Sequence, residues 1–124
     1  MFWCTKFFNE ARKLVSAEQF KAVALAPGIV EGTVRIVSSP DEAGDLGQDC
    51  ILVCPSTDPG WTALFVTIKG LVVERGGVLS HGAITARDFG IPAVACPDAT
   101  KLLRELSRVS VDGNRGEVTV LGRK

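Results

Sequence analysis

Residues 69–96, "KGLVVERGGVLSHGAITARDFGIPAVAC", carry the pattern that determines the fold. The apolar run "LVV" near its start predicts a short buried strand. A glycine pair at 76–77 interrupts the chain, and residues 80–89 predict a helix. Gly90 is typical of a helix C-terminus, Pro92 prevents the helix from continuing, and the apolar "AVAC" predicts a second buried strand. This stretch therefore predicts a strand–helix–strand unit.

The segments on either side extend this unit into an α/β domain. The run "CILVC" predicts a buried strand, and Gly32 in an earlier strand indicates a bulge or close packing. A β-hairpin is expected where two alternating runs flank Asp112-Gly113. The fold class is therefore a compact α/β domain with a mixed sheet and flanking helices. Its expected elements are strands near 30–37, 50–54, 69–75 and 93–96, helices near 41–46, 61–68, 80–89 and 97–106, and a hairpin over 108–121.

Composition excludes several classes of protein. The chain has 124 residues, of which 46% are hydrophobic and 23% charged, which is an ordinary globular balance for one domain. Lys plus Arg equals Asp plus Glu, so no bulk charge favours nucleic acid or an anionic membrane. Because no run of 18 apolar residues occurs, we expect a cytoplasmic protein without a membrane span.

The cysteines indicate buried thiols rather than a metal or disulfide framework. Cys50, Cys54 and Cys96 lie in apolar runs, and Cys4 lies near the N-terminus. No CxxC pair is present and the chain holds a single histidine, so we expect no metal site. Reduced thiols of this kind suit the cytosol.

The N-terminal segment differs from the rest of the chain. Apolar residues at helical spacing predict a helix over 5–20. We therefore expect two parts, residues 1–22 as an N-terminal helix or linker remnant and residues 23–124 as the main domain.

His81 stands at the predicted start of the helix over 80–89. A helix N-terminus offers unpaired N–H groups and the positive end of a dipole, which favour a bound phosphate. Gly82 leaves those amides open, and Gly76 and Gly77 allow another molecule to approach closely. A neutral imidazole in this setting is suited to act as a nucleophile. Arg75, beside the glycine pair, is a candidate phosphate contact.

These residues alone leave structural interpretations open. Ser80 is more often a helix cap than a catalytic group. Thr85 lies one turn after His81 and is expected to bond its own helix backbone. For Arg87 and Asp88, contacts with phosphate and a cation are open alternatives to salt bridges.

The run "GGVLSHGAITARDFGIPAV" resembles the phosphohistidine signature of the PEP-utilising enzymes, GGxxSHxAxxARxxGIPAV. "TDPGWTALF", "KGLVVERGG", "APGIVEGTVRIV" and "VSVDGNRGEVTVL" resemble further parts of the same domain, closest to the phosphoenolpyruvate synthase and rifampicin phosphotransferase branch. The resemblance covers about residues 23–121. It implies a swivelling β/β/α domain that carries a phosphoryl group on His81, with Ser80 and the pair Gly76 and Gly77 at the matching signature positions.

The resemblance also implies what the carrier needs from other domains. ATP or PEP and Mg²⁺ are expected on a partner, either an ATP-grasp nucleotide-binding domain or another chain, and this domain itself is expected to bind no cofactor. A PEP/pyruvate-binding domain or another acceptor-binding domain is the second expected partner. Pyruvate, water and an antibiotic hydroxyl all remain open as acceptors. Two alternative functions remain, a non-catalytic binding or regulatory module on the same fold and a small metal or redox protein built on the cysteines.

Overall fold

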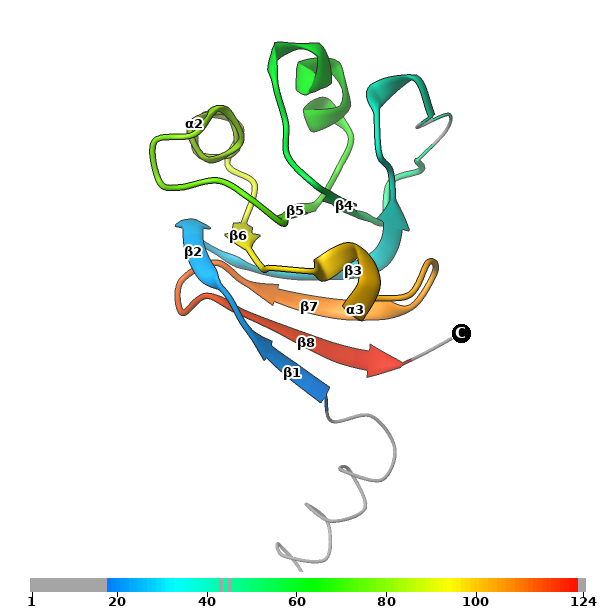
Figure 1. Ribbon diagram of the computed structural model, residues 1–124. Helices are drawn as coiled ribbons and strands as arrows, with labels where there is room; N and C mark the ends of the chain where they lie inside the picture. Colours follow the sequence, from blue (N-terminus) through cyan, green and yellow to red (C-terminus); the bar gives the residue numbers. More distant parts are fainter. Residues whose placement is uncertain (1–17, 43, 45, 123–124) are drawn as a thin grey trace, which may run out of the picture.

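The computed structural model describes residues 18–42, 44 and 46–122, and its strands form one eight-stranded sheet in the order β1-β8-β7-β3-β4-β5-β6-β2 (Figure 1). The strands are β1 Glu18–Lys21, β2 Val23–Ala26, β3 Ile29–Ile36, β4 Cys50–Cys54, β5 Gly70–Val73, β6 Ala93–Ala95, β7 Arg108–Asp112 and β8 Glu117–Gly122. The helices are the 3-10 helices η1 Pro40–Glu42 and η2 Pro59–Val66, and the α-helices α2 His81–Phe89 and α3 Ala99–Leu102.

The sheet is mixed, as the sequence predicts. Strands β3, β4, β5 and β6 run parallel to one another, whereas the pairs β3–β7, β7–β8, β8–β1 and β6–β2 are antiparallel. Only Ala22 separates β1 from β2, yet these two strands occupy opposite ends of the sheet order. Residues 18–26 therefore supply the strand at each end of the sheet order, which requires the sheet to curl so that its two ends come together (Figure 1). The Ala22 amide donates to the carbonyl of Gly116 at this crossing.

The central parallel strands β4 and β5 have no polar residues, because both of their faces are covered. On β4, Leu52 and Cys54 face the cluster under η2 and α2, and Ile51 and Val53 face the opposite cluster, to which α3 contributes. All five residues of β4 and all four of β5 are buried. The continuous apolar runs in the sequence therefore correspond to parallel strands buried on both faces, as predicted.

Both ends of α2 follow the sequence prediction. Ser80 is the N-cap, with extended backbone, and its side chain accepts a hydrogen bond from the Ala83 amide. Gly90 takes the left-handed conformation at φ 72°, where glycine carries no Cβ penalty, and its amide bonds the carbonyls of Ala86 and Arg87.

Three expected elements differ in the structure. Residues 18–20, the end of the helix predicted over 5–20, belong to strand β1 because they pair with β8; the remainder of that prediction lies outside the described residues. The helix predicted near 61–68 is the 3-10 helix η2. The helix predicted over 97–106 is reduced to α3, because Asp98 has φ 63° and Leu103 is already extended and buried.

Other local predictions are confirmed. A Cβ on Gly32 would lie 2.9 Å from the Asp49 carbonyl oxygen, which is the close packing that a glycine in this strand indicated. The β7–β8 hairpin forms, and the Asp112 carboxylate accepts from the Asn114 and Arg115 amides in its turn. In the part of the chain described, no helix is both long and apolar enough to cross a membrane.

Candidate functional site

The candidate site lies where the parallel strands β4 and β5 end. The segment after β4 contains Thr57, and the segment after β5 leads through Arg75 to α2. Backbone hydrogen bonds join the two segments, since the amides of Glu74 and Arg75 both donate to the Pro55 carbonyl. Parallel strands place their carboxyl ends at one edge of a sheet, where ligands bind in folds of this class.

Ser80 fixes the chain as it enters α2. Its Oγ donates to the Gly77 carbonyl at 2.7 Å and accepts from the Ala83 amide at 3.4 Å. The Ser80 side chain thus joins the glycine loop to the first turn of the helix. A cap of this kind stabilises a helix start by about 1 kcal/mol, and here it also determines where the next residue, His81, begins the helix.

Thr57 holds the imidazole of His81. Its Oγ1 lies 3.1 Å from Nδ1 of His81. Phe65 of η2 packs at the edge of the imidazole, with ring centroids 6.3 Å apart and planes inclined at 69°. Among the described residues, no hydrogen bond reaches Nε2, and no buried side-chain nitrogen lacks a partner, so Nε2 is not buried. The ring is therefore held at Nδ1 and open at Nε2. His81 itself is half-buried.

Two glycines are required by the close packing around this ring. A Cβ on Gly82 would lie 2.8 Å from Oγ1 of Thr57, the atom that contacts the imidazole. Gly76 has φ 140°, a conformation that side chains rarely adopt, and a Cβ there would lie 3.1 Å from Oγ of Ser80. A Cβ on Gly77 would meet no atom within 4 Å, so packing does not require glycine there. The Gly77 carbonyl accepts the hydrogen bond from Oγ of Ser80.

A hollow of about 180 Å³ opens beside the helix start. Its lining includes Arg75, Gly76, Ser80 and Gly82, which the sequence predicts as phosphate-positioning residues. Thr57, the partner of His81, also lines it. Arg75 is exposed and supplies the only charged side chain among the described lining residues. Ser56 and Val73 complete the lining, so the hollow is small and carries a positive charge on one side.

Glu74 anchors the segment that presents Arg75. Its carboxylate accepts hydrogen bonds from the backbone amide of Thr100 at 2.9 Å and from the Thr100 hydroxyl. These bonds, first of all that from the hydroxyl, lower the pKa of Glu74 below its usual value. The end of β5 is thereby tied to α3.

Arg87 anchors the loop that precedes His81. One guanidinium nitrogen donates to the Leu25 carbonyl at 2.7 Å, and the other donates to the Val78 carbonyl at 2.5 Å. Among the described residues, Arg87 thus bonds two backbone carbonyls rather than forming a salt bridge. The guanidinium joins strand β2 to the loop, which a fork of fixed N–H donors does well.

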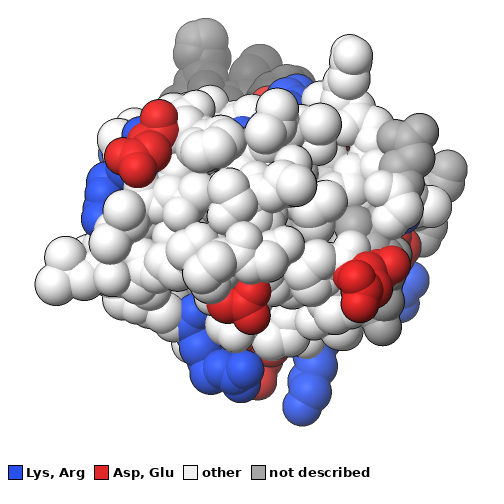
Figure 2. All heavy atoms as spheres, turned by 90° about the horizontal axis from the view of Figure 1, so that it is seen from above, with Lys and Arg blue, Asp and Glu red and all other residues white. Residues whose placement is uncertain are grey.

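The segments around His81 expose both charged and apolar side chains, and Asp58, Arg75, Arg87 and Asp88 are the charged ones. Figure 2 shows the molecule from the side of α2 and η2, with charged side chains gathered toward the margins of that face. Val66, Val78, Leu79, Ile84 and Phe89 are exposed large apolar residues on the segments next to His81.

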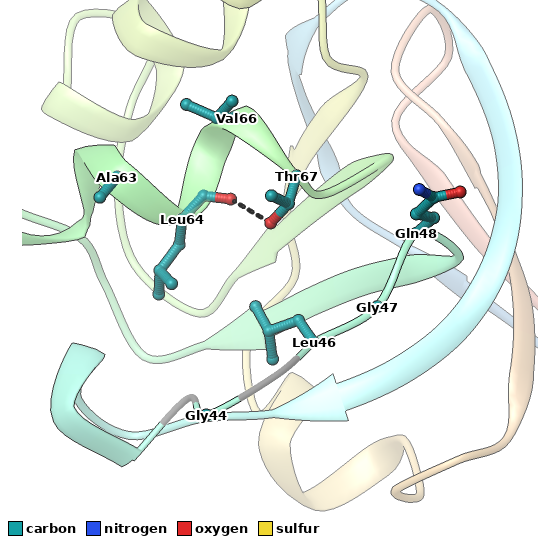
Figure 3. Close-up of a pocket in the computed structure, with 8 residues that line it drawn as sticks. All are labelled: Gly44, Leu46, Gly47, Gln48, Ala63, Leu64, Val66 and Thr67. Atoms are coloured by element: carbon teal, nitrogen blue, oxygen red, sulfur yellow. Dashed lines mark hydrogen bonds between the residues drawn. The ribbon is translucent and has the colours of Figure 1, made fainter.

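A larger hollow of about 460 Å³ lies elsewhere, between η2 and the segment before β4 (Figure 3). None of its eight described lining residues is charged or titratable, and the hydrogen bond inside it joins Thr67 to the Leu64 carbonyl. Because it offers no nucleophile, acid or base, the smaller hollow beside His81 is the candidate for chemistry.

The cysteines are not placed for chemistry. Cys50, Cys54 and Cys96 are free and buried, as predicted, whereas Cys4 lies outside the described residues. Burial raises the pKa of Cys50 to about 11 and that of Cys54 to about 12, and it also raises the pKa of Cys96. Thiols of this kind are inert. Within the described residues, no group of His, Cys, Asp and Glu side chains could hold a metal ion.

Thr57 is the site residue that sequence reasoning missed. The sequence analysis quoted "TDPGWTALF" as part of the family resemblance but gave its first residue no role. The contact joins residues 24 positions apart, and it exists because β4 and β5 run parallel and end at the same edge. The available signal was the "TDPGW" segment, which follows β4, together with an expected parallel strand pair.

Comparison with known proteins assigns the chain to a family. The family described as "PEP-utilising enzyme, mobile domain" matches residues 46–116, which include both Thr57 and His81. Rifampicin phosphotransferase of Bacillus cereus is 44% identical over 111 residues, covering 89% of this chain and 13% of the relative. The Bacillus subtilis protein of the same name is 40% identical over 110 residues, covering 88% of this chain and 13% of the relative. The chain thus spans about an eighth of the length of these curated relatives.

Solved structures agree on the fold. An NMR structure of Enzyme I is 32% identical, with a TM-score of 0.56, and the match covers 64% of this chain and 33% of that one. Aconitase X of Thermococcus kodakaraensis gives a TM-score of 0.65 at 22% identity, covering 84% of this chain and 98% of that one. The second match shows the fold alone, so the residues around His81 must carry any functional argument.

Proposed function

The chain belongs to the mobile-domain family of the PEP-utilising enzymes, and from this premise we propose that it is a phosphoryl carrier that accepts and passes on phosphate through His81. The two relatives of this chain described above are both phosphotransferases. The observation that carries the proposal is the imidazole held at Nδ1 and open at Nε2, beside a small hollow lined by Ser80 and Arg75.

Thr57 selects the nitrogen that reacts. When Nδ1 carries the proton, it donates to Oγ1 of Thr57, and the lone pair of the neutral ring is then on Nε2. In the transfer step, Nε2 forms a bond to phosphorus while the bond from phosphorus to the leaving oxygen breaks, and its electron pair departs with that oxygen. A second nucleophile later takes the phosphoryl group from Nε2, which regenerates the imidazole.

The surroundings of the ring suit a phosphorylated histidine. A phosphoryl group carries up to two negative charges near neutral pH. The N-terminus of α2 supports such charge through its dipole and its first amides. Arg75 lines the adjacent hollow and is positioned to pair with the phosphoryl oxygens. Gly76, Gly77 and Gly82 keep that approach clear of side chains.

The donor and the acceptor belong to other parts of the system. Because the chain covers only 13% of the length of its phosphotransferase relatives, partner domains account for most of those proteins. We propose that ATP or PEP, with Mg²⁺, is bound by an ATP-grasp or comparable donor domain, and that an acceptor domain receives the phosphate. Rifampicin is the acceptor that the names of the relatives suggest.

The test uses phosphoramidate, a small phosphoryl donor that needs no protein partner. The 124-residue chain is incubated with it and then analysed by intact mass and tandem mass spectrometry. We expect one acid-labile phosphoryl group on His81, formed as the P–N bond of phosphoramidate breaks and ammonia leaves. His81→Gln should show none while keeping the same thermal unfolding. A phosphoryl group on Ser80, or none on the unsubstituted chain, would overturn the assignment.

A further inference from the structure

Two acidic residues stand next to the lining of the hollow at the start of α2, and both carboxylates are bonded elsewhere. Asp58 caps η2, where its Oδ1 accepts a hydrogen bond from the Gly60 amide at 2.8 Å. Glu74, directly after β5, accepts two hydrogen bonds from Thr100 of α3. Among the described residues, no salt bridge joins either carboxylate to Arg75, the charged residue in the lining.

Glu74 and Arg75 direct their side chains toward different helices. Side chains alternate along an extended chain, and residues 73–75 follow this pattern at the end of β5. Val73 and Arg75 both line the hollow beside α2, whereas Glu74 bonds Thr100 of α3. The acid and the base are therefore neighbours in the sequence that are held apart in space.

Thr100 is well suited to hold a carboxylate. It is the second residue of α3, so its amide has no partner within the helix, and Oε2 of Glu74 accepts from this amide at 2.9 Å. The Thr100 hydroxyl donates to the same oxygen. These two bonds, the hydroxyl first, lower the pKa of Glu74, and the cations of Arg75 and Lys101 also lower it. The charge of Arg75 is therefore close enough to compete with Thr100 for the carboxylate.

This competition matters because an ion pair with Glu74 would neutralise Arg75. Phosphoryl transfer is promoted by fixed cations that act on the phosphoryl oxygens. A guanidinium already paired with a carboxylate offers an anion fewer N–H donors and no net charge. The hollow beside His81 would then lose the charged group that its described lining provides.

We infer that Thr100 and Glu74 are positioning residues for phosphoryl transfer, because Thr100 holds Glu74 at α3 and so keeps the guanidinium of Arg75 available to the phosphoryl group. This inference rests on the proposed function and extends it to α3, which lies outside the run of sequence around His81. Two observations support it: both donors of Thr100 bond one oxygen of Glu74, and Arg75 lines the hollow without a salt bridge among the described residues.

The experiment measures the initial rate at which phosphoramidate phosphorylates His81 in the 124-residue chain. Thr100→Val keeps the shape of threonine but removes the hydroxyl that bonds Glu74. We expect the rate to fall about threefold as the carboxylate pairs with Arg75, which is the order of effect of one exposed ion pair. Arg75→Gln should fall by at least as much, and Thr100→Ser should keep the rate within about twofold of the unsubstituted chain.

A matched control is Thr33→Val. The hydroxyl of Thr33 also donates to a carboxylate, that of Asp49 at 3.0 Å, but it lies at the amino ends of the parallel strands. This variant should react at the unsubstituted rate. The unfolding temperature of every variant is measured alongside, so that a loss of folded protein is not taken for a loss of rate.

The double variant Thr100→Val/Glu74→Gln distinguishes this role from a purely structural one. With no carboxylate left to pair with Arg75, the double variant should regain the unsubstituted rate, whereas damage to α3 alone would persist. In a chain that carries Arg75→Gln, adding Thr100→Val should slow the reaction no further, because both changes act through one guanidinium.

Different failures point to different errors. If phosphoramidate fails to modify His81 in the unsubstituted chain, the proposed function itself fails. If it modifies His81 but Thr100→Val reacts at full rate, or the double variant stays as slow as Thr100→Val, only the inference about Thr100 and Glu74 is overturned. A full rate in Arg75→Gln would also overturn it, since Arg75 would then take no part in the transfer.

Discussion

The two ends of strands β4 and β5 are stabilised by different kinds of interaction. At the amino ends, the carboxylate of Asp49 forms salt bridges with Lys69 at 3.0 Å and Arg108 at 2.7 Å, and accepts a hydrogen bond from Thr33. At the carboxyl ends, the charged anchors Glu74 and Arg87 bond to neutral groups, a threonine and two carbonyls.

This difference shows how stability and chemistry are separated in a small domain. At the amino ends, opposite charges neutralise one another in a local network. At the carboxyl ends, hydrogen bonds to neutral partners hold the loops in place, and Arg75 lines the hollow beside His81. Changes at the carboxyl ends should therefore affect phosphoryl acceptance first, and changes at the amino ends should affect only stability.

The largest effect is expected from Gly82→Ala. The new methyl group would lie 2.8 Å from Oγ1 of Thr57 and would displace this hydroxyl from Nδ1 of His81. We expect the rate of phosphorylation by phosphoramidate to fall about 100-fold, the order of loss that misplacement of a reacting group causes. The unfolding temperature should change little, because alanine favours the helix more than glycine does.

The control is Gly122→Ala, since a Cβ on Gly122 meets nothing within 4 Å. It should leave both the rate and the unfolding temperature unchanged. If Gly82→Ala reacts as fast as the unsubstituted chain, the packing of Thr57 against the helix start is not what orients His81.

Thr57→Val should give the next largest effect. Valine keeps the shape of threonine but removes Oγ1, so Nδ1 loses its partner. We expect about a tenfold slower reaction with phosphoramidate, and Thr57→Ser should restore most of the rate. Nitrogen NMR of the imidazole provides a readout that a packing role would not change: valine should shift the tautomer balance away from the Nδ1-protonated form. An unchanged balance would contradict the role given to Thr57.

The sequence predicted the parts of the fold that depend on local pattern. Continuous apolar runs identified β4 and β5, because strands buried on both faces have no polar positions. Ser80 and Gly90 marked the ends of α2 through their capping chemistry. Strand β1 was missed because helical spacing suggested a helix over 5–20, whereas pairing with β8, about 100 residues away, makes Glu18–Lys21 a strand.

The same distinction applies to the site. His81, Ser80 and the glycines were found because they lie together in one run of sequence. Thr57 was not, because its contact with His81 depends on how two parallel strands align. For Arg87 a salt bridge was one predicted alternative, and its partners among the described residues are instead backbone carbonyls, which carry no residue identity and leave no sequence signal.

Arg87→Lys tests whether neutral partners hold the carboxyl ends. Lysine keeps the charge but cannot bond the carbonyls of Leu25 and Val78 with one planar fork. We expect a loss of about 1–2 kcal/mol in the free energy of unfolding, measured with urea. Because the partners are uncharged, this loss should be nearly the same at low and high salt. A loss that disappears in high salt would indicate that an ion pair, rather than these hydrogen bonds, holds the loop.

Asp49→Asn should have the smallest effect and should affect stability alone. Hydrogen bonds from Lys69, then Arg108 and Thr33, lower the pKa of Asp49 from 3.8 to about 2 in the folded protein. A lowered pKa stabilises the fold fully above the unfolded value, and this contribution is lost as pH falls from about 4 to about 2. Because these side chains are about half exposed, the loss in Asp49→Asn should be about 0.5–1 kcal/mol near neutral pH.

Urea unfolding of both proteins across this pH range provides the measurement. The difference between them should shrink as pH falls through the folded pKa, and high salt should reduce it at neutral pH. Phosphorylation of His81 by phosphoramidate should remain within twofold of the unsubstituted rate, because Asp49 lies at the opposite end of the strands. A large loss of rate in Asp49→Asn would mean that the two ends of β4 and β5 are coupled, and that stability and chemistry are not separated in this domain.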